Sequence, residues 1–227
     1  MQPYFLPYIG YWQLINYVDK FIIYDNIEYT KKGWINRNRL LLNSQPYTFT
    51  IPLKKDSDYL TISDREIAQS FNRKSFLSKV KNCYSKSPNF VEVNPVIKKI
   101  INSNSSNLFM FILESIRQIC NYIDIDFSKI IISSKIPINH DLKSEKKIIS
   151  ICKEIGGTEY INPIGGQKLY SESNFKKENI KLRFLESNKI TYKQFDNEFI
   201  PFLSILDHLM FNDIDEIKKQ VKNFNLK

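Results

Sequence analysis

The sequence predicts an α/β fold with a Rossmann-like, mostly parallel sheet, helices packed against that sheet, and a helical middle segment. Short apolar runs typical of buried strands alternate along the chain with amphipathic segments that have the period of a helix. The 227 residues, 42% of them hydrophobic and 25% charged, have the composition of an ordinary globular protein and the length of one domain or two small ones. We expect a single domain over residues 1–227, in which residues 70–125 form a candidate helical subdomain.

The first half of the chain is expected to contain a helix, two strands and then three more helices. Ile9–Tyr17 has apolar residues at spacings of three and four, which is typical of an amphipathic helix. Lys20–Asp25 is a short apolar run that ends in an acid, and Tyr47–Leu53 has a β-type composition, so both segments predict strands. Apolar periodicity predicts the three later helices at Arg73–Lys86, Val96–Ile101 and Leu108–Ile123.

The second half continues the alternation of strands and helices. Ile130–Ile132 predicts a strand, and Ser144–Ile155 predicts a helix that ends at the following glycine pair. Further β-type runs lie at Glu159–Ile161, Ile180–Leu185 and Ile190–Phe195. A last amphipathic helix carries Ile214, Ile217, Val221 and Phe224. Because strands and helices alternate, at least part of the sheet should be parallel.

Basic residues outnumber acidic residues by 33 to 24, which gives a formal net charge of +9. A charge of this size suggests nucleic acid as a partner. However, 27 of the basic residues are lysines, and their doublets are scattered along the chain instead of forming one phosphate track. We therefore interpret the charge mainly as surface lysine, with a small anionic substrate and a nucleic acid as the alternatives.

Cysteine spacing and hydropathy exclude several classes of protein. Cys83, Cys120 and Cys152 form no CxxC pair and have no Cys/His ligand spacing, so we expect neither a metal site nor a disulfide framework. We interpret them as buried, reduced thiols of a cytosolic protein. No apolar run approaches the ~18–20 residues of a membrane-spanning helix, and the N-terminus lacks the pattern of a signal peptide.

The segment Gln2–Trp12 contains five aromatic residues, two prolines and one glycine in eleven positions. Proline fixes φ and Gly10 permits close backbone approach, so we expect a preset loop that leads into the first helix. Its candidate substrate-binding residues are Gln2, Tyr4, Tyr8 and Tyr11. The alternative is that the aromatic side chains pack in the core, above all Phe5 and Trp12.

A polar and cationic segment, Asp25–Arg39, begins where the strand Lys20–Asp25 should end. It holds two of the six arginines in a chain that otherwise prefers lysine. Arginine binds anions through a planar, bidentate fork, so this choice predicts an anion site. The candidate substrate-binding residues are Lys32, Trp34, Asn36, Arg37 and Arg39. The alternative is a solvated hairpin. If the loop at Gln2–Gly10 follows a neighbouring parallel strand, both segments should line one pocket at the same edge of the sheet.

The sequence resembles the WbqC-like proteins of bacterial surface-polysaccharide gene clusters. The similarity is carried by QPYFLPYIGYWQLI (Gln2–Ile15), DKFIIYDNIEYTKKGWINRNRLL (Asp19–Leu41) and FIPFLSILDHLMFN (Phe199–Asn212). The resemblance implies a role in O-antigen or lipopolysaccharide synthesis, in which an acyl group, such as glycyl, is attached to the amino group of a nucleotide-linked amino sugar. Members of that family usually carry a short hydrophobic strand before QPYF, so either this strand is shortened here or the start codon is assigned late.

Groups for acid–base chemistry are few. The candidate catalytic residues are Asp25 at the end of a strand, Asp207, and His140 in the loop after another strand. On a helix, Ser204, Asp207 and His208 would share one face, so Ser204 is a candidate substrate-binding residue unless Ser204 and Asp207 cap the helix. The alternative for His140 is an exposed loop position. The GxSxG, HExxH, P-loop and GxGxxG patterns are absent, which excludes the standard hydrolase, zinc protease, NTPase and dinucleotide-binding interpretations.

The expected function is the transfer of an acyl or aminoacyl group to the amino group of a nucleotide-linked amino sugar. We assign pyrophosphate binding to Lys32, Arg37 and Arg39, base stacking to Trp34 or Tyr8, and proton transfer to Asp25 or Asp207. The acyl donor is left open, and no nucleic acid is expected to bind unless the donor is an aminoacyl-tRNA. The alternatives are a protein that binds the nucleotide sugar or scaffolds the pathway without catalysis, and an RNA-binding module suggested by the net charge alone.

Overall fold

The computed structural model describes residues 1–196 and 198–227. The helices are α1 (Ile9–Tyr17), α2 (Arg73–Tyr84), α3 (Phe90–Ile101), α4 (Leu108–Ile123), α5 (Ser144–Glu154), α6 (Glu172–Lys177), α7 (Ile205–Phe211) and α8 (Ile214–Gln220). The strands are β1 (Phe21–Ile23), β2 (Arg37–Leu42), β3 (Gln45–Thr50), β4 (Ile130–Ile132), β5 (Glu159–Pro163), β6 (Lys181–Ser187) and β7 (Phe224–Leu226). Short 3₁₀ helices include η1 (Ile62–Asp64) and η3 (Ser133–Lys135).

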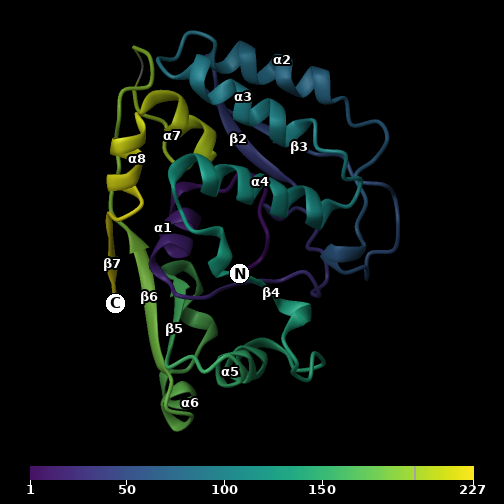
Figure 1. The fold of residues 1–227 in the computed structure, drawn as a ribbon, viewed down its shortest axis with the longest axis vertical. Coiled ribbons are helices and arrows are strands. Elements are labelled where there is room, and N and C mark those ends of the chain that lie inside the picture. The colour runs from purple at the N-terminus through teal and green to yellow at the C-terminus, as the bar shows by residue number, and fades with distance from the viewer. Residues whose placement is uncertain (197) are drawn as a thin grey trace.

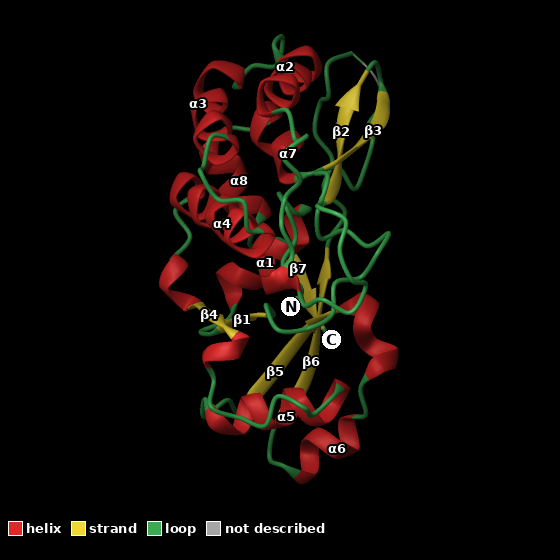
Figure 2. Cartoon of the chain, turned by 90° about the vertical axis from the view of Figure 1, so that its right-hand side faces the viewer, coloured by secondary structure: helices red, strands yellow, loops and turns green. Residues whose placement is uncertain are grey.

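The elements divide between the two ends of a molecule that is longer than it is wide (Figure 1). The helices α2 and α3 and the β2–β3 hairpin lie at one end, and α5 and α6 lie at the other. Figure 2 shows the same division from the side, with β5 and β6 running toward α5 and α6. The helices α1 and α4 lie between the two ends (Figures 1 and 2).

The strands form three small sheets. β1 pairs with β4 in parallel, with Phe21 opposite Ile130, and β5 pairs with β6 in parallel. β2 and β3 form an antiparallel hairpin, and β7 adds to β6 in the antiparallel direction. The predicted α/β class, with parallel strand pairs and flanking helices, is confirmed.

Met1 lies beside β1 as a parallel neighbour. Its amino group donates to the Ile22 carbonyl at 2.6 Å, and the Tyr24 N–H donates to the Met1 carbonyl at 2.8 Å. Gln2 therefore leaves this sheet at the same edge as Asp25. Met1 also lines a cavity of about 470 Å³ that separates β1 from β5 and is bounded by α5.

The helix α4 forms the centre of the core because apolar residues occupy most of its circumference. Eleven of its sixteen residues are buried. Asn107 caps it by accepting the N–H of Met110 at 3.0 Å. Phe111 stacks on Phe5 of the N-terminal loop, with 5.2 Å between the ring centroids. Core packing therefore accounts for Phe5, and Trp12 is fully buried as well.

The helix α3 begins earlier than its sequence indicates. It starts at Phe90 rather than Val96 and contains Pro95, although proline removes a helical hydrogen bond. Val93 before the proline and Ile97 after it are both fully buried. Packing on both sides of Pro95 thus outweighs the local cost of the proline. The prediction from periodicity began at Val96 and therefore missed the first half of the helix.

Two predictions near the C-terminus are wrong. Ile190–Phe195 forms no strand. Its Gln194 side chain instead bonds to the backbone of Ile200, donating from Nε2 to the Ile200 carbonyl at 3.1 Å and accepting the Ile200 N–H at Oε1 at 2.7 Å. The last helix ends at Gln220, and Phe224 lies in β7 instead of on the helix.

Cys83, Cys120 and Cys152 are buried free thiols. Burial raises the pKa of these thiols to about 11, 12 and 11 respectively, so they are protonated at neutral pH. Across residues 1–196 and 198–227, none of the helices has the length and apolar character needed to traverse a bilayer.

Candidate functional site

Three segments that are far apart in the sequence meet at the carbonyl of Leu6. Its oxygen accepts the Asn38 side-chain amide at 2.7 Å and the Ser204 hydroxyl at 2.8 Å. The Ser204 N–H also donates to the Arg39 carbonyl at 2.9 Å. Leu6 has φ of +49°, a left-handed conformation that is strained for a leucine. These bonds tie the N-terminal loop, β2 and the start of α7 into one unit.

Ser204 caps α7 and is fully buried. Its hydroxyl oxygen accepts the N–H of Leu206 at 3.3 Å while its proton is donated to Leu6. Of the two roles that the sequence leaves open for this residue, capping is therefore the one that its contacts explain.

The strand β2 presents asparagines to the interior and arginines to the other face. The Asn36 amide donates to the Ile51 carbonyl at 2.7 Å, and Asn36 accepts the Tyr29 hydroxyl at 2.7 Å. Asn36, just before β2, and Asn38, within it, are buried, whereas Arg37 and Arg39 are half-buried. The alternation of a strand thus separates the structural amides from the cationic side chains.

Arg37 and Arg39 both lie within cation–π distance of one indole ring. Their guanidinium carbons are 5.1 Å and 5.0 Å from the ring centroid of Trp34, which is 42% exposed. Arg37 donates to the carbonyl of Lys32, a residue with φ of +61°. The structure therefore brings together four of the predicted substrate-binding residues: Lys32, Trp34, Arg37 and Arg39.

Arg65 is a third arginine at this site, and the sequence analysis missed it. It directly follows η1, and its guanidinium carbon lies 4.9 Å from the ring centroid of Tyr29. We call Arg37, Arg39 and Arg65 the arginine cluster. None of the three forms an ion pair within the described residues, whereas Arg117 and Arg183 pair with glutamates. Arginine is rare in this lysine-rich chain, but that rarity alone does not separate Arg65 from Arg73, Arg117 and Arg183, so its place at this site needed the structure.

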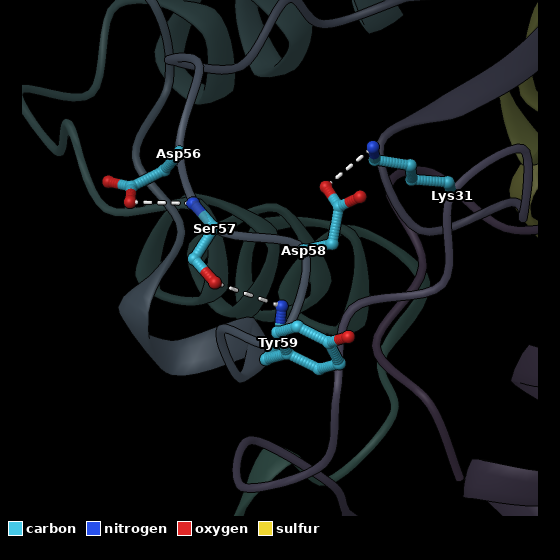
Figure 3. A network of polar contacts seen from close by, with 5 residues as sticks. All are labelled: Lys31, Asp56, Ser57, Asp58 and Tyr59. Carbon is cyan, nitrogen blue, oxygen red and sulfur yellow. Dashed lines mark hydrogen bonds and ion pairs between the residues drawn. The ribbon is translucent and has the colours of Figure 1, made fainter.

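A surface loop next to this site carries its own ion pair (Figure 3). Lys31 pairs with Asp58 at 2.5 Å, and the Tyr59 N–H donates to the Ser57 hydroxyl at 3.3 Å. The loop lies against the chain at Tyr29, whose N–H donates to the Leu60 carbonyl at 3.1 Å. Lys31 is thus neutralised locally, in contrast to the arginine cluster.

Asp25 lies at the carboxyl end of the parallel β1–β4 pair. One carboxylate oxygen accepts the Ser134 N–H at 2.9 Å, and the other accepts the Ser134 hydroxyl at 2.5 Å. Ser134 belongs to η3, which directly follows β4. This edge is where ligands bind in open parallel sheets. Each oxygen keeps lone-pair capacity for one further proton or donor.

His140 and Lys147 lie beside Asp25. The His140 ring accepts the Asn26 amide at Nδ1 (2.8 Å) and contacts the Ile136 carbonyl at Nε2 (3.0 Å). Because a carbonyl oxygen only accepts, His140 Nε2 carries a proton and donates it to Ile136. Lys147, which sequence reasoning missed, donates to the His140 carbonyl at 3.3 Å. Burial lowers the pKa of Lys147, and the charge of Asp25 opposes this shift.

The aromatic residues of the N-terminal loop separate into two groups. Tyr4 donates to the Gln2 side chain at 3.0 Å, and Tyr11 donates to the Gln2 carbonyl at 3.1 Å, close to the end of β1. Tyr8 instead lies against α7, with its ring centroid 5.8 Å from that of His208. Gln2, Tyr4 and Tyr11 therefore accompany the β1 edge, and Tyr8 does not.

Asp207 lies in a different environment from Asp25. It is fully buried and accepts three hydrogen bonds, from Tyr84 (3.0 Å), Tyr192 (2.7 Å) and Gln194 (2.6 Å). Burial raises its pKa to about 6, and the three hydrogen bonds oppose this shift. We call these four residues and the adjacent His208 the Asp207 network. It joins α2, α7 and the segment before α7 through neutral donors.

Comparison with known proteins supports the similarity noted in the sequence. A model of the WbqC-like protein family matches residues 2–219. The chain is also 29% identical over 219 residues to uncharacterized protein Rv1507c of Mycobacterium tuberculosis, a match that covers 93% of this chain and 91% of the relative. No solved structure matches it. Because the family model spans nearly the whole sequence, the chain belongs to the WbqC-like protein family.

Proposed function

We propose that the protein transfers an acyl or aminoacyl group, with glycyl as one candidate, to the amino group of a nucleotide-linked amino sugar in bacterial surface-polysaccharide synthesis. One observation carries the proposal. Three arginines gather around Tyr29 and Trp34, and none has an acidic partner among the described residues. An uncompensated set of guanidinium groups is suited to a diphosphate, which carries several negative charges and planar acceptor edges.

The proposed binding mode follows from the exposure of the groups. Arg37 and Arg39 are half-buried and would each hold phosphate oxygens through two N–H donors, with Lys32 adding charge. Trp34 is 42% exposed and would stack on the nucleotide base. Tyr8 is left out because it lies against His208 and α7.

Asp25 is the proposed base. It connects to the arginine cluster through the chain between Leu60 and Arg65, because its carbonyl accepts the Ser63 N–H at 2.9 Å. In the proposed step the sugar amine forms a bond to the acyl carbonyl carbon, and the bond from that carbon to the donor's leaving oxygen or sulfur breaks. The amine proton passes to the Asp25 carboxylate. Asp207 is not chosen because it has no exposed surface and already holds three donors.

A second candidate function is binding of the nucleotide sugar without catalysis. The hydrogen bonds at the β1–β4 edge favour it, because Ser134 engages both Asp25 oxygens and both His140 nitrogens have partners. A rigid, satisfied edge of this kind can recognise a ligand without exchanging protons with it.

The variant Asp25→Asn tests the choice between the two functions. If Asp25 is the base, the variant binds nucleotide sugars as the wild type does, and turnover falls by about 10²–10⁴-fold because an amide cannot accept the proton. Binding is measured by calorimetry with a panel of nucleotide amino sugars. Turnover is measured with acyl-CoA and aminoacyl-tRNA donors. Wild-type binding with no turnover on any donor supports the binding protein, and normal turnover by Asp25→Asn contradicts the assigned base.

A further inference from the structure

Arg65 carries the most deeply buried charge of the arginine cluster. Its side chain is 4% exposed, and its Nε and Nη2 atoms are covered without a hydrogen-bond partner in the described part of the chain. Burying a guanidinium group is strongly unfavourable unless an acid or several acceptors compensate for the lost water. The charge of Arg65 therefore needs an explanation.

The neighbouring acids do not neutralise Arg65. The Asp64 carboxylate accepts the Thr61 hydroxyl at 2.6 Å, and the Glu66 carboxylate pairs with Lys54 at 3.0 Å. The Tyr29 ring covers one face of the guanidinium group, and the Nε and Nη2 atoms find no acceptor among residues 1–196 and 198–227.

Arg73 shows how this fold satisfies an arginine that has a structural role. Its guanidinium carbon also lies near an aromatic ring, 5.5 Å from the centroid of Phe71. However, its Nε donates to the Ile101 carbonyl at 2.8 Å, and its Nη2 donates to two further carbonyls at 3.3 Å each. The two arginines have similar aromatic contacts, but only Arg73 has acceptors for its N–H groups within the described residues, so the Arg65 guanidinium group is left with donors for a ligand.

Tyr29 connects Arg65 to the outer part of the cluster. Burial raises the pKa of Tyr29, and the charges of both Arg65 and Arg37 oppose that shift, which requires both guanidinium groups to lie within range of this phenol. Its hydroxyl donates to Asn36 at the start of β2. Arg65 thus lies on the inner side of Tyr29, while Arg37 extends toward Trp34 and the surface.

We infer that Arg65 forms an inner phosphate subsite, in which its guanidinium group binds one phosphate of a diphosphate whose remaining oxygens contact Arg37 and Arg39. This inference rests on the proposed function for the identity of the ligand. It adds Arg65 as the residue that sets how deeply the diphosphate binds. A diphosphate is negatively charged and supplies both the acceptors and the counter-charge that Arg65 lacks among the described residues. Free pyrophosphate and a nucleoside diphosphate share this chemistry.

Titration calorimetry with inorganic pyrophosphate, uridine diphosphate and a nucleotide amino sugar tests the subsite, together with melting temperatures in phosphate-free buffer. We expect Arg65→Met to keep or raise the melting temperature of the free protein, because it removes an uncompensated buried charge. We expect its affinity for pyrophosphate to fall at least about tenfold. The matched control Arg73→Met should lower the melting temperature and leave pyrophosphate affinity unchanged.

The conservative variant Arg65→Lys keeps the charge and loses the planar fork. It should remain folded and bind pyrophosphate more weakly than the wild type, and it decides the test if Arg65→Met fails to fold. Normal pyrophosphate affinity in Arg65→Lys and Arg65→Met, or a wild type that binds no pyrophosphate, would overturn the inference.

The three ligands separate this inference from the proposed function. Pyrophosphate binding that depends on Arg65, in a protein that binds no nucleotide sugar, supports the subsite and contradicts the proposed substrate. Nucleotide-sugar binding that survives Arg65→Met but not Arg37→Ala overturns the subsite and leaves the proposed function standing.

Discussion

The Asp207 network and the arginine cluster both bury a charged group, but only the first surrounds that group with hydrogen-bond partners from the same chain. Asp207 accepts hydrogen bonds from three side chains of the same chain. Arg65 has neither an acid nor an acceptor for two of its nitrogens within the described residues. A charge that the fold satisfies holds elements together, whereas a charge that the fold leaves open is available to a ligand. The contrast predicts that substitutions in the first region lower stability and that substitutions in the second weaken binding.

Removal of the Asp207 carboxylate should have the largest effect on stability. Asp207→Ala leaves the donors of Tyr84, Tyr192 and Gln194 without their acceptor in the core. We expect the free energy of unfolding to fall by about 3–5 kcal/mol, because each buried unsatisfied donor costs about 1–3 kcal/mol. Urea denaturation measures this loss. A loss below about 1 kcal/mol would show that water or rearrangement satisfies the donors and would break the comparison.

The Asp207 network should also determine how stability depends on pH, through two shifts of opposite sign. Burial raises the pKa of Asp207 from 3.8 to about 6. The folded protein therefore binds this proton more tightly than the unfolded chain, and the resulting contribution to the free energy of unfolding is full below pH 4 and is lost as the pH rises through 6. Burial lowers the pKa of His208 from 6.5 to about 4. The contribution of neutral His208 to the free energy of unfolding is therefore full above pH 6.5 and is lost as the pH falls through 4. In the wild type the two effects nearly cancel.

Single substitutions remove that cancellation. His208→Gln should become more stable as the pH falls from 6 to 4, and Asp207→Asn should become less stable over the same range, each by up to about 3 kcal/mol. Urea unfolding at pH values between 4 and 7 measures both slopes. Equal slopes in the two variants would mean that these groups do not titrate with the assigned shifts.

The outer part of the candidate site could be predicted from the sequence because its signals are local. Arg37, Arg39 and Trp34 lie within six positions, in a chain that otherwise uses lysine. Arg65 has no such local signal, since its position over Tyr29 depends on the pairing of two distant segments. The strand β2 was missed because its first three residues are polar, although their alternation buries the asparagine and leaves the arginines half-buried.

The two candidate carboxylates show the same limit. The apolar run before Asp25 was enough to place this residue at the end of a strand. Its bonds to Ser134 could not be predicted, because Ser134 lies 109 positions away. Asp207 resembles a catalytic acid in the sequence because the triplet with Ser204 and His208 interrupts an apolar segment. The donors that surround it come from Tyr84 and from the irregular segment at 192–194, which tertiary packing alone brings together.

Arg37→Ala should weaken nucleotide-sugar binding by about 1.5–3 kcal/mol, the range for a charge-assisted hydrogen bond. Its melting temperature should change little, because Arg37 is half-buried and, among the described residues, its side chain bonds only to the Lys32 carbonyl. Calorimetry measures the affinity and differential scanning fluorimetry the stability. A variant that binds normally but melts early would place Arg37 with the structural residues and contradict its role in binding.

Lys31→Ala should have the smallest effect on both properties and serves as the control for charge. Lys31 lies six positions before Arg37 and carries the same charge, but it pairs with Asp58 at 2.5 Å, and both side chains are more than half exposed. An exposed ion pair contributes about 0–1 kcal/mol to stability, and its charge is already balanced. We expect stability and nucleotide-sugar affinity both to stay within about 0.5 kcal/mol of the wild type in the same two assays. If Lys31→Ala weakens binding as much as Arg37→Ala, the general positive potential attracts the ligand, and the uncompensated arginines have no special part in binding it.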